Sequence, residues 1–127
     1  MKKILIVDDD MDIIELVKNR LIKNGYEVIF ANDGDDGFKK VVEHKPNLII
    51  MDIMMPRLSG GEAVKLLRSN DATQYTPVLF LSVLATNLPT DGGLDEINVG
   101  GQLYPAITKP FEPNKLLSAI KSLLGDE

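Results

Sequence analysis

Residues 3–10 read Lys-Ile-Leu-Ile-Val-Asp-Asp-Asp, an apolar run that ends in three aspartates. A short run without polar alternation is typical of a strand buried on both faces, as in a parallel sheet. Residues 11–24 then show helical spacing and end at Asn24-Gly25, a common helix stop. The side chains expected to face inward from this helix are Ile13, Ile14, Val17, Leu21 and Ile22. A strand followed by an amphipathic helix is the repeating unit of α/β domains.

The same alternation continues along the chain. Further apolar runs predict strands over residues 26–31, 48–53, 77–82 and 103–108. Helical spacing predicts helices over 35–44 and 59–69, and a closing helix with the apolar stripe Leu116, Leu117, Ile120, Leu123 and Leu124. Five strands alternating with helices predict right-handed crossovers and a parallel sheet covered on both faces. The expected fold is therefore a three-layer α/β domain.

Local signals refine two of these helices and leave one segment irregular. Ser59 and Glu62 form a capping-box pair at the start of the helix over 59–69. The side chains expected to face inward from the helix over 35–44 are Phe38, Val41 and Val42. Residues 83–101 are rich in glycine and proline, so any helix in this segment is expected to be short.

Composition excludes several classes of protein. The chain has 127 residues, enough for one domain with its own core. Its 14 Lys and Arg against 19 Asp and Glu give a net charge of -5, which disfavours direct nucleic-acid binding. Cysteine is absent, so disulfides and thiolate chemistry are excluded, and a cytoplasmic location is expected. No apolar run approaches the roughly 20 residues of a membrane span, and no export signal is expected after Met1.

Polar residues follow the predicted strands at their carboxyl ends, where open parallel sheets bind ligands. Asp8-Asp9-Asp10 follows the first strand, Asp52 lies near the end of the third, Ser82 ends the fourth, and Lys109-Pro110 follows the fifth. Carboxylates about 4 Å apart repel one another by roughly 4 kcal/mol at an effective dielectric constant near 20, so such a cluster requires a cation. All-oxygen ligands suit Mg²⁺.

A cation at this edge would allow phosphoryl chemistry. With the ion in place, Lys109 and the Ser82 hydroxyl could complete a clamp on phosphoryl oxygens. Asp52 is the candidate phosphoryl acceptor because the buried strand before it would hold its carboxylate rigidly. Asp8 and Asp9 are then candidate metal ligands, whereas Asp10 is assigned to capping the following helix.

Four segments together resemble the receiver domain of two-component response regulators. They are Ile4-Leu5-Ile6-Val7-Asp8-Asp9-Asp10, Met51-Asp52-Ile53-Met54-Met55-Pro56 with Gly60, Leu81-Ser82, and Lys109-Pro110-Phe111. The resemblance spans residues 1–127 as one domain. It implies a flavodoxin-like fold with a five-stranded parallel sheet of order 2-1-3-4-5 and about five helices.

The resemblance also implies a function. Asp52 would accept a phosphoryl group from a histidine kinase or histidine phosphotransfer protein and thereby switch the binding of a downstream effector protein or output domain. Asp9, Asp52 and the Met54 carbonyl would contact Mg²⁺, with Asp8 bound through water. Ser82 and Lys109 would bind the phosphoryl group, and the Lys109-Pro110 bond would be cis. Whether the chain forms a homodimer stays open, and such a module would catalyse only its own modification.

The chain departs from the family pattern near the usual output surface. Most receivers have an aromatic residue three positions before the lysine of the fifth strand, and here that position is Ala106. Tyr104 lies two residues earlier and would face the same side of the sheet, although Pro105 disturbs the ladder. The segment from Ser82 to Lys109 is also several residues longer than usual, so the fourth helix is expected to be atypical.

Other interpretations remain open at this point. Taken singly, Asp8 to Asp10 could be helix caps, Ser82 a turn residue and Lys109 a solvated lysine; their combination argues against this. A degenerate receiver that binds partners constitutively is one alternative. A haloacid-dehalogenase-like phosphatase, with Asp8 and Asp10 as nucleophile and acid, is the other. That alternative needs a further acidic motif after Lys109, where only Glu112, Asp126 and Glu127 remain.

Overall fold

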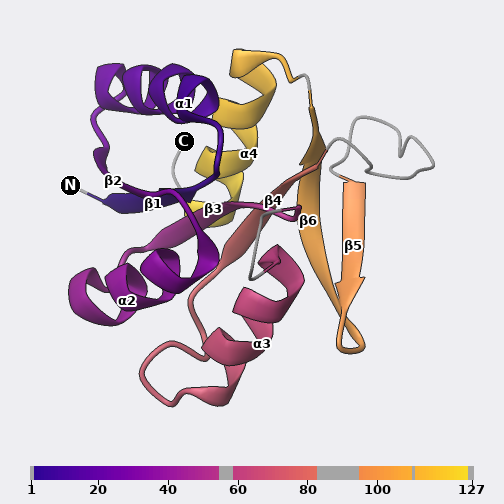
Figure 1. Cartoon of the computed structure of the whole chain (residues 1–127). Coiled ribbons are helices and arrows are strands. Elements are labelled where there is room, and N and C mark those ends of the chain that lie inside the picture. The colour runs from indigo at the N-terminus through magenta and orange to yellow at the C-terminus, as the bar shows by residue number, and fades with distance from the viewer. Residues whose placement is uncertain (1, 55–58, 83–94, 110, 126–127) are drawn as a thin grey trace.

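The computed structural model describes residues 2–54, 59–82, 95–109 and 111–125. The strands are β1 (Lys3–Val7), β2 (Glu27–Ala31), β3 (Leu48–Asp52), β4 (Val78–Ser82), β5 (Asp95–Val99) and β6 (Gln102–Thr108). The helices are α1 (Met11–Lys23), α2 (Gly34–His44), α3 (Gly60–Ser69) and α4 (Pro113–Leu124). Figure 1 shows these elements as one sheet with helices on both sides.

The sheet confirms the expected parallel order and adds a strand to it. Its six strands follow the order β2-β1-β3-β4-β6-β5. All neighbours among the first five are parallel, so β6 takes the place of the expected fifth strand. The sixth strand, β5, runs antiparallel to β6 at the margin of the sheet. The described residues contain four helices, and residues 83–94, where the atypical helix was expected to begin, lie outside them.

Each central strand is buried on both faces, which explains its uninterrupted apolar sequence. Ile4 and Ile6 of β1 pack on the side of α1 and α4, whereas Leu5 and Val7 pack on the side of α2 and α3. All of these side chains have no exposed surface. Burying one such side chain stabilises the folded state by about 1.5–3 kcal/mol. The two apolar layers therefore fix the strand register on which the site depends.

The helix ends largely follow the sequence signals. Ser59 and Glu62 form the expected capping box at α3, and the Asp10 side chain caps α1 by accepting a hydrogen bond from the Asp12 backbone N–H. Two side chains expected to face inward do not. Ile22 is 51% exposed and Val42 is 41% exposed. Each lies next to a residue that does reach the core, Leu21 and Val41, because a helix can bury only part of its circumference.

The last part of the segment expected to be irregular, residues 95–101, forms a hairpin with β6. Val99 faces Gln102 across a two-residue turn. The turn residues, Gly100 and Gly101, have positive φ angles of 63° and 89°, as a type I′ turn requires. Ile97 and Val99 pack on the same apolar layer as α3. The two glycines therefore favour a tight turn, and this turn lets residues 95–99 pair with β6 as strand β5.

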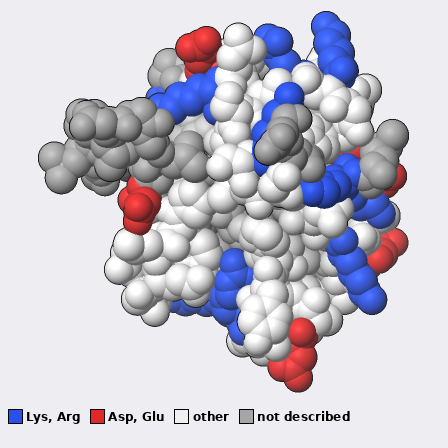
Figure 2. All heavy atoms as spheres, turned by 180° about the vertical axis from the view of Figure 1, so that it is seen from behind, with Lys and Arg blue, Asp and Glu red and all other residues white. Residues whose placement is uncertain are grey.

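Charged side chains are spread over the reverse face of the molecule. Figure 2 shows that, on the reverse face, the Lys and Arg side chains stand mostly apart, with uncharged surface between them. Among the described residues, none of the helices has the length and apolarity needed to cross a membrane.

The contact between α2 and β1 predicts an unusual effect of a helix glycine. Although alanine favours a helix over glycine by about 1 kcal/mol, Gly37→Ala should destabilise the protein. A Cβ atom at Gly37 would lie 2.9 Å from Cγ2 and 3.1 Å from Cγ1 of Val7, a stiff and fully buried side chain. We expect the free energy of unfolding to fall by about 1–3 kcal/mol in urea denaturation.

Gly61→Ala in α3 is the matched control for this variant. The nearest atoms to a Cβ at Gly61 lie 3.9 Å away, so this substitution should be neutral or stabilise by up to about 1 kcal/mol. A Gly37→Ala protein as stable as Gly61→Ala would contradict the packing argument.

Candidate functional site

The sheet brings the carboxyl ends of its central strands to one edge. Val7 of β1 lies beside Met51 of β3, and Asp52 lies beside Leu81 of β4. Since these neighbours are parallel, Asp8, Asp52 and Lys109 all follow or end strands at the same edge. The arrangement is a direct consequence of register, because a slip of one residue would turn these side chains to the opposite faces.

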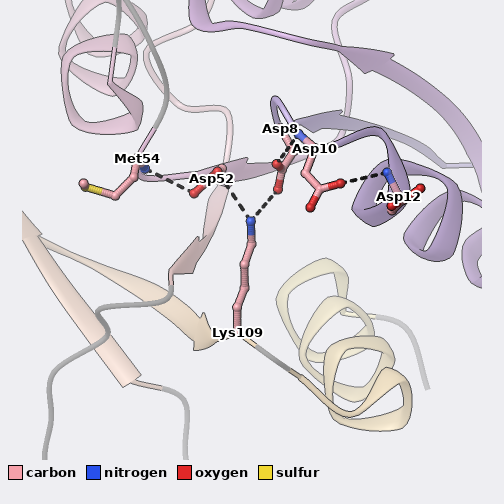
Figure 3. A network of polar contacts seen from close by, with 6 residues as sticks. All are labelled: Asp8, Asp10, Asp12, Asp52, Met54 and Lys109. Atoms are coloured by element: carbon pink, nitrogen blue, oxygen red, sulfur yellow. Dashed lines mark hydrogen bonds and ion pairs between the residues drawn. The ribbon is translucent and has the colours of Figure 1, made fainter.

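Three carboxylates meet at this edge. Asp8, Asp9 and Asp52 each place an oxygen within 4.8 Å of the others. Asp8 is fully buried, Asp52 is 6% exposed, and Asp9 is exposed. Figure 3 shows Asp8 and Asp52 directed toward one another from β1 and β3. The site therefore has two sheltered carboxylates and a third that is open to solvent.

The ammonium group of Lys109 bridges the two sheltered carboxylates. Its Nζ donates a hydrogen bond to Asp8 Oδ2 at 2.8 Å and lies 3.4 Å from Asp52 Oδ2 (Figure 3). The Lys109 side chain is only 12% exposed, so both ion pairs are shielded from water. The attraction between charges is stronger in this setting than on the surface, but burial also costs the charges their hydration. Removing Lys109 would leave two sheltered carboxylates without a counter-charge, whereas removing Asp52 leaves Lys109 paired with Asp8.

Backbone N–H groups occupy the other oxygen of each sheltered carboxylate. The Asp10 N–H donates to Asp8 Oδ1 at 2.9 Å, and the Met54 N–H donates to Asp52 Oδ1 at 3.1 Å. These bonds hold the carboxylates in place through the turns that follow β1 and β3 (Figure 3). The Met54 side chain is 57% exposed and lies at the rim of the site.

Burial and charge shift the titration of Asp52 and Lys109. Burial raises the pKa of Asp52 above its ordinary value; the charge of Asp8 adds to this, while the Met54 N–H and Lys109 oppose it. Burial alone would lower the pKa of Lys109, but its hydrogen bond to Asp8 and the charges of Asp8 and Asp52 raise it above its ordinary value. Lys109 therefore stays protonated at neutral pH.

The donor set suits a small, hard divalent cation. It consists of carboxylate oxygens at the carboxyl ends of the strands, with no nitrogen or sulfur ligand among them. Mg²⁺ prefers one or two carboxylates with water completing its coordination. The three carboxylates exceed the single ammonium group by two negative charges when all are ionised, which a divalent ion would balance.

Most of the residues singled out in the sequence meet here. Asp8, Asp9, Asp52 and Lys109 come together, and Met54 touches Asp52 through its N–H. The backbone of Ser82 lies beside Thr108 at the same edge, but its side chain and the Lys109-Pro110 bond lie outside the described part of the chain. Met51, interpreted as a core residue, is buried.

Tyr104 is a buried residue of β6, with 4% of its surface exposed. It shares the apolar layer of Ala106, as the period of a strand predicts. Its ring meets Phe80 edge-on at 5.7 Å, and its hydroxyl accepts a hydrogen bond from Arg68 Nε at 3.0 Å. Sequence reasoning did not identify Arg68, because nothing in the sequence of α3 indicates that it reaches β6.

Comparison with known proteins is consistent with this geometry. Residues 4–121 match the family model described as response regulator receiver domain. Protein PilG of Pseudomonas aeruginosa is 39% identical over 94% of this chain and 85% of its own length. The alkaline phosphatase synthesis transcriptional regulatory protein PhoP of Bacillus subtilis is 37% identical over 97% of this chain, which spans only 48% of that relative.

Solved structures show the same architecture. Chemotaxis response regulator CheY4 of Vibrio cholerae superposes with a TM-score of 0.80 at 31% identity, covering 98% of this chain and 99% of that one.

The raised pKa of Asp52 predicts that Asp52→Asn increases the free energy of unfolding at neutral pH in EDTA. Above the folded-state pKa, the ionised carboxylate destabilises the folded state. As the pH falls through that pKa, Asp52 takes up a proton and the penalty is lost. The gain should therefore be largest near neutral pH and shrink on acidification, as measured by urea denaturation across pH.

Asp71→Asn serves as the control, because Asp71 is an exposed loop residue. It should change stability little at any of these pH values. A destabilised Asp52→Asn protein at neutral pH would mean that the attraction of Lys109 outweighs the burial of Asp52.

Proposed function

The chain belongs to the response regulator receiver domain family of two-component signalling, and we propose that it is a phosphorylation switch with Asp52 as the acceptor. The proposed domain comprises residues 1–127, and its proposed compartment is the cytoplasm. The observation that carries the assignment is the Lys109 ammonium group shared by Asp8 and Asp52 at 2.8 and 3.4 Å. It places a fixed positive charge beside the proposed acceptor oxygen.

The proposed metal is Mg²⁺, held by Asp8, Asp9 and Asp52 with the Met54 carbonyl. Receiver domains bind this ion in their acidic pocket, and here the three carboxylates lie close enough to share one ion. When bound, the ion neutralises negative charge on a phosphoryl group. The proposal assigns Asp8 a water-mediated contact, because Asp8 already accepts hydrogen bonds from Lys109 and the Asp10 N–H.

The proposed reaction is transfer of a phosphoryl group from a phosphohistidine to Asp52. A carboxylate oxygen of Asp52 forms the new P–O bond as the P–N bond to the imidazole breaks, and the imidazole nitrogen keeps the electron pair. The protonated Lys109 offsets charge on the phosphoryl oxygens, and the Ser82 hydroxyl is the proposed second contact. The donor is a histidine kinase or histidine phosphotransfer protein, and the product binds a downstream effector or output domain.

Receiver domains are phosphoacceptor switches that are generally not classed as enzymes. For this chain, we propose catalysis only of its own phosphorylation and dephosphorylation. A phosphatase of the haloacid-dehalogenase type would need Asp10 free to act as an acid. The Asp10 side chain instead accepts a hydrogen bond from the Asp12 N–H at 2.9 Å (Figure 3), which supports its role as the cap of α1.

The acceptor assignment predicts a labile phosphoryl adduct on Asp52. Incubation with acetyl phosphate and Mg²⁺ should add one phosphoryl mass to the wild type, detected by intact-mass spectrometry. Asp52→Asn should give no adduct, and EDTA should suppress it in the wild type. If no adduct forms even with a phosphohistidine donor, the constitutive-binding alternative is favoured. Turnover that persists in Asp52→Asn but is lost in Asp8→Asn would point to the phosphatase.

The exposed Met54 side chain predicts a long-lived acyl phosphate. It lies at the rim of the site and carries no polar group to orient an attacking water. Met54→Asn supplies an amide there and should speed hydrolysis several-fold, measured by loss of the phosphoryl mass over time. Met11→Asn, at an exposed position on α1, is the control and should not change the rate. Fast hydrolysis in the wild type that Met54→Asn leaves unchanged would reject this explanation.

A further inference from the structure

Strand β5 lies at the margin of the sheet (Figure 1). Among residues 2–54, 59–82, 95–109 and 111–125, it pairs with β6 alone, which leaves its outer edge open within this part of the chain. Val99 and Gln102 close the two-residue turn, so they form a hydrogen-bonded pair, and such pairs recur at every second residue. The backbone groups of Val99, Ile97 and Asp95 therefore point toward β6. Those of Glu96 and Asn98 point away from it, along the open edge.

The opposite edge of the sheet carries lysines, whereas β5 carries none. At β2, Lys40 Nζ hydrogen-bonds the Phe30 carbonyl, and Lys18 and Lys40 lie over the Phe30 ring at 5.6 and 5.5 Å. Lysines of this kind block the addition of another strand. The sequence of β5, Asp-Glu-Ile-Asn-Val, contains no lysine, arginine or proline.

We propose that two copies of this chain pair through β5, antiparallel about a two-fold axis at Ile97. In this register, Glu96 of one copy faces Asn98 of the other, and their outward N–H and C=O groups exchange two hydrogen bonds. Symmetry repeats the exchange on the other side of the axis. The two six-stranded sheets become one continuous sheet. The pairing is independent of Asp52 and extends beyond the proposed phosphorylation function.

Two-fold symmetry lets a second copy occupy this edge without placing like charges directly opposite one another. In the proposed register, Asp95 faces Val99 and Glu96 faces Asn98, so no carboxylate lies directly opposite another carboxylate. A register shifted by one residue in either direction loses this matching of inward and outward backbone groups. Among the registers that keep this matching, the one centred on Ile97 pairs all five residues of β5, whereas a shift by two residues pairs fewer of them.

The charge and the length of β5 determine how strongly two copies would associate. Each copy contributes two acidic side chains and carries a net charge of -5, so the copies repel one another at low ionic strength. A five-residue strand also buries less surface than the roughly 1,000 Å² typical of a stable interface. Association should therefore be weak and concentration-dependent, and added salt should strengthen it by screening the repulsion.

Engineered cysteines can test the register, because the native chain has none. Glu96→Cys and Asn98→Cys each place one thiol on the exposed face of β5. Paired residues in the proposed dimer have Cα atoms about 5.5 Å apart, within disulfide range. The same position in the two copies is offset by two residues along the strands, so the Cα atoms of two identical positions lie too far apart for a disulfide. Mild oxidation of a mixture of the two variants should therefore give a disulfide dimer several times faster than either variant alone.

Random collision between thiols sets the background rate of cross-linking, and a control mixture measures it. A mixture of Glu96→Cys with Glu15→Cys, which is exposed on α1, gives the background rate on a non-reducing gel. Cross-linking of the Glu96 and Asn98 variants at that background rate would overturn the proposal. Cross-linking equally fast in either variant alone would also overturn it, because that result requires a different register.

Sedimentation of the full chain provides a measurement without cysteines. Glu96→Gln keeps the outward N–H and removes a negative charge, so it should increase dimerisation. Glu96→Pro removes the outward N–H without affecting pairing to β6, so it should abolish dimerisation. A Glu96→Gln protein that stays monomeric at millimolar concentration and high salt would overturn the proposal. So would equal dimerisation of both variants, whereas binding of a foreign extended peptide without self-association would assign the edge to another protein.

Discussion

Lys109 resolves an electrostatic conflict that the sheet itself creates. Parallel strands in register bring Asp8, Asp9 and Asp52 within 4.8 Å of one another. Charges this close repel by roughly 4 kcal/mol a pair at an effective dielectric constant near 20. The ammonium group of Lys109, at 2.8 Å from Asp8 and 3.4 Å from Asp52, offsets part of that repulsion. A bound divalent cation would balance the negative charge that remains.

This site could be predicted from the sequence because each of its parts follows from a local rule. Apolar runs without alternation identified β1, β3 and β4 as central strands, and the carboxyl ends of parallel strands meet at one edge. Placing Asp8, Asp52 and Lys109 together therefore required only the strand order. The sharing of one ammonium group by two carboxylates could not be predicted, because it depends on side-chain conformations and on burial.

The parts that sequence analysis missed depend on competition between signals or on distant contacts. Gly100-Gly101 between Val99 and Gln102 is a hairpin signal. It was missed because the glycines and prolines of residues 83–101 were interpreted together as the mark of an irregular segment. Ile22 and Val42 were misplaced because spacing identifies an apolar side of a helix but not its width. The contact of Arg68 with Tyr104 joins residues 36 positions apart, and helical periodicity carries no information about it.

Strand β6 joins the acidic site at Lys109 to the marginal strand β5. Lys109 directly follows this strand, which pairs with β4 on one side and β5 on the other. Ala106, which faces Phe80 across the ladder, has no side-chain rotamer to change, and Tyr104 is held by its hydrogen bond to Arg68 and its contact with Phe80. Turning Tyr104 outward would break that bond and expose a ring that is now 4% exposed. Neither Ala106 nor the buried Tyr104 therefore provides a free aromatic rotamer beside Lys109, and the backbone of β6 is the direct link from Lys109 to both β4 and β5.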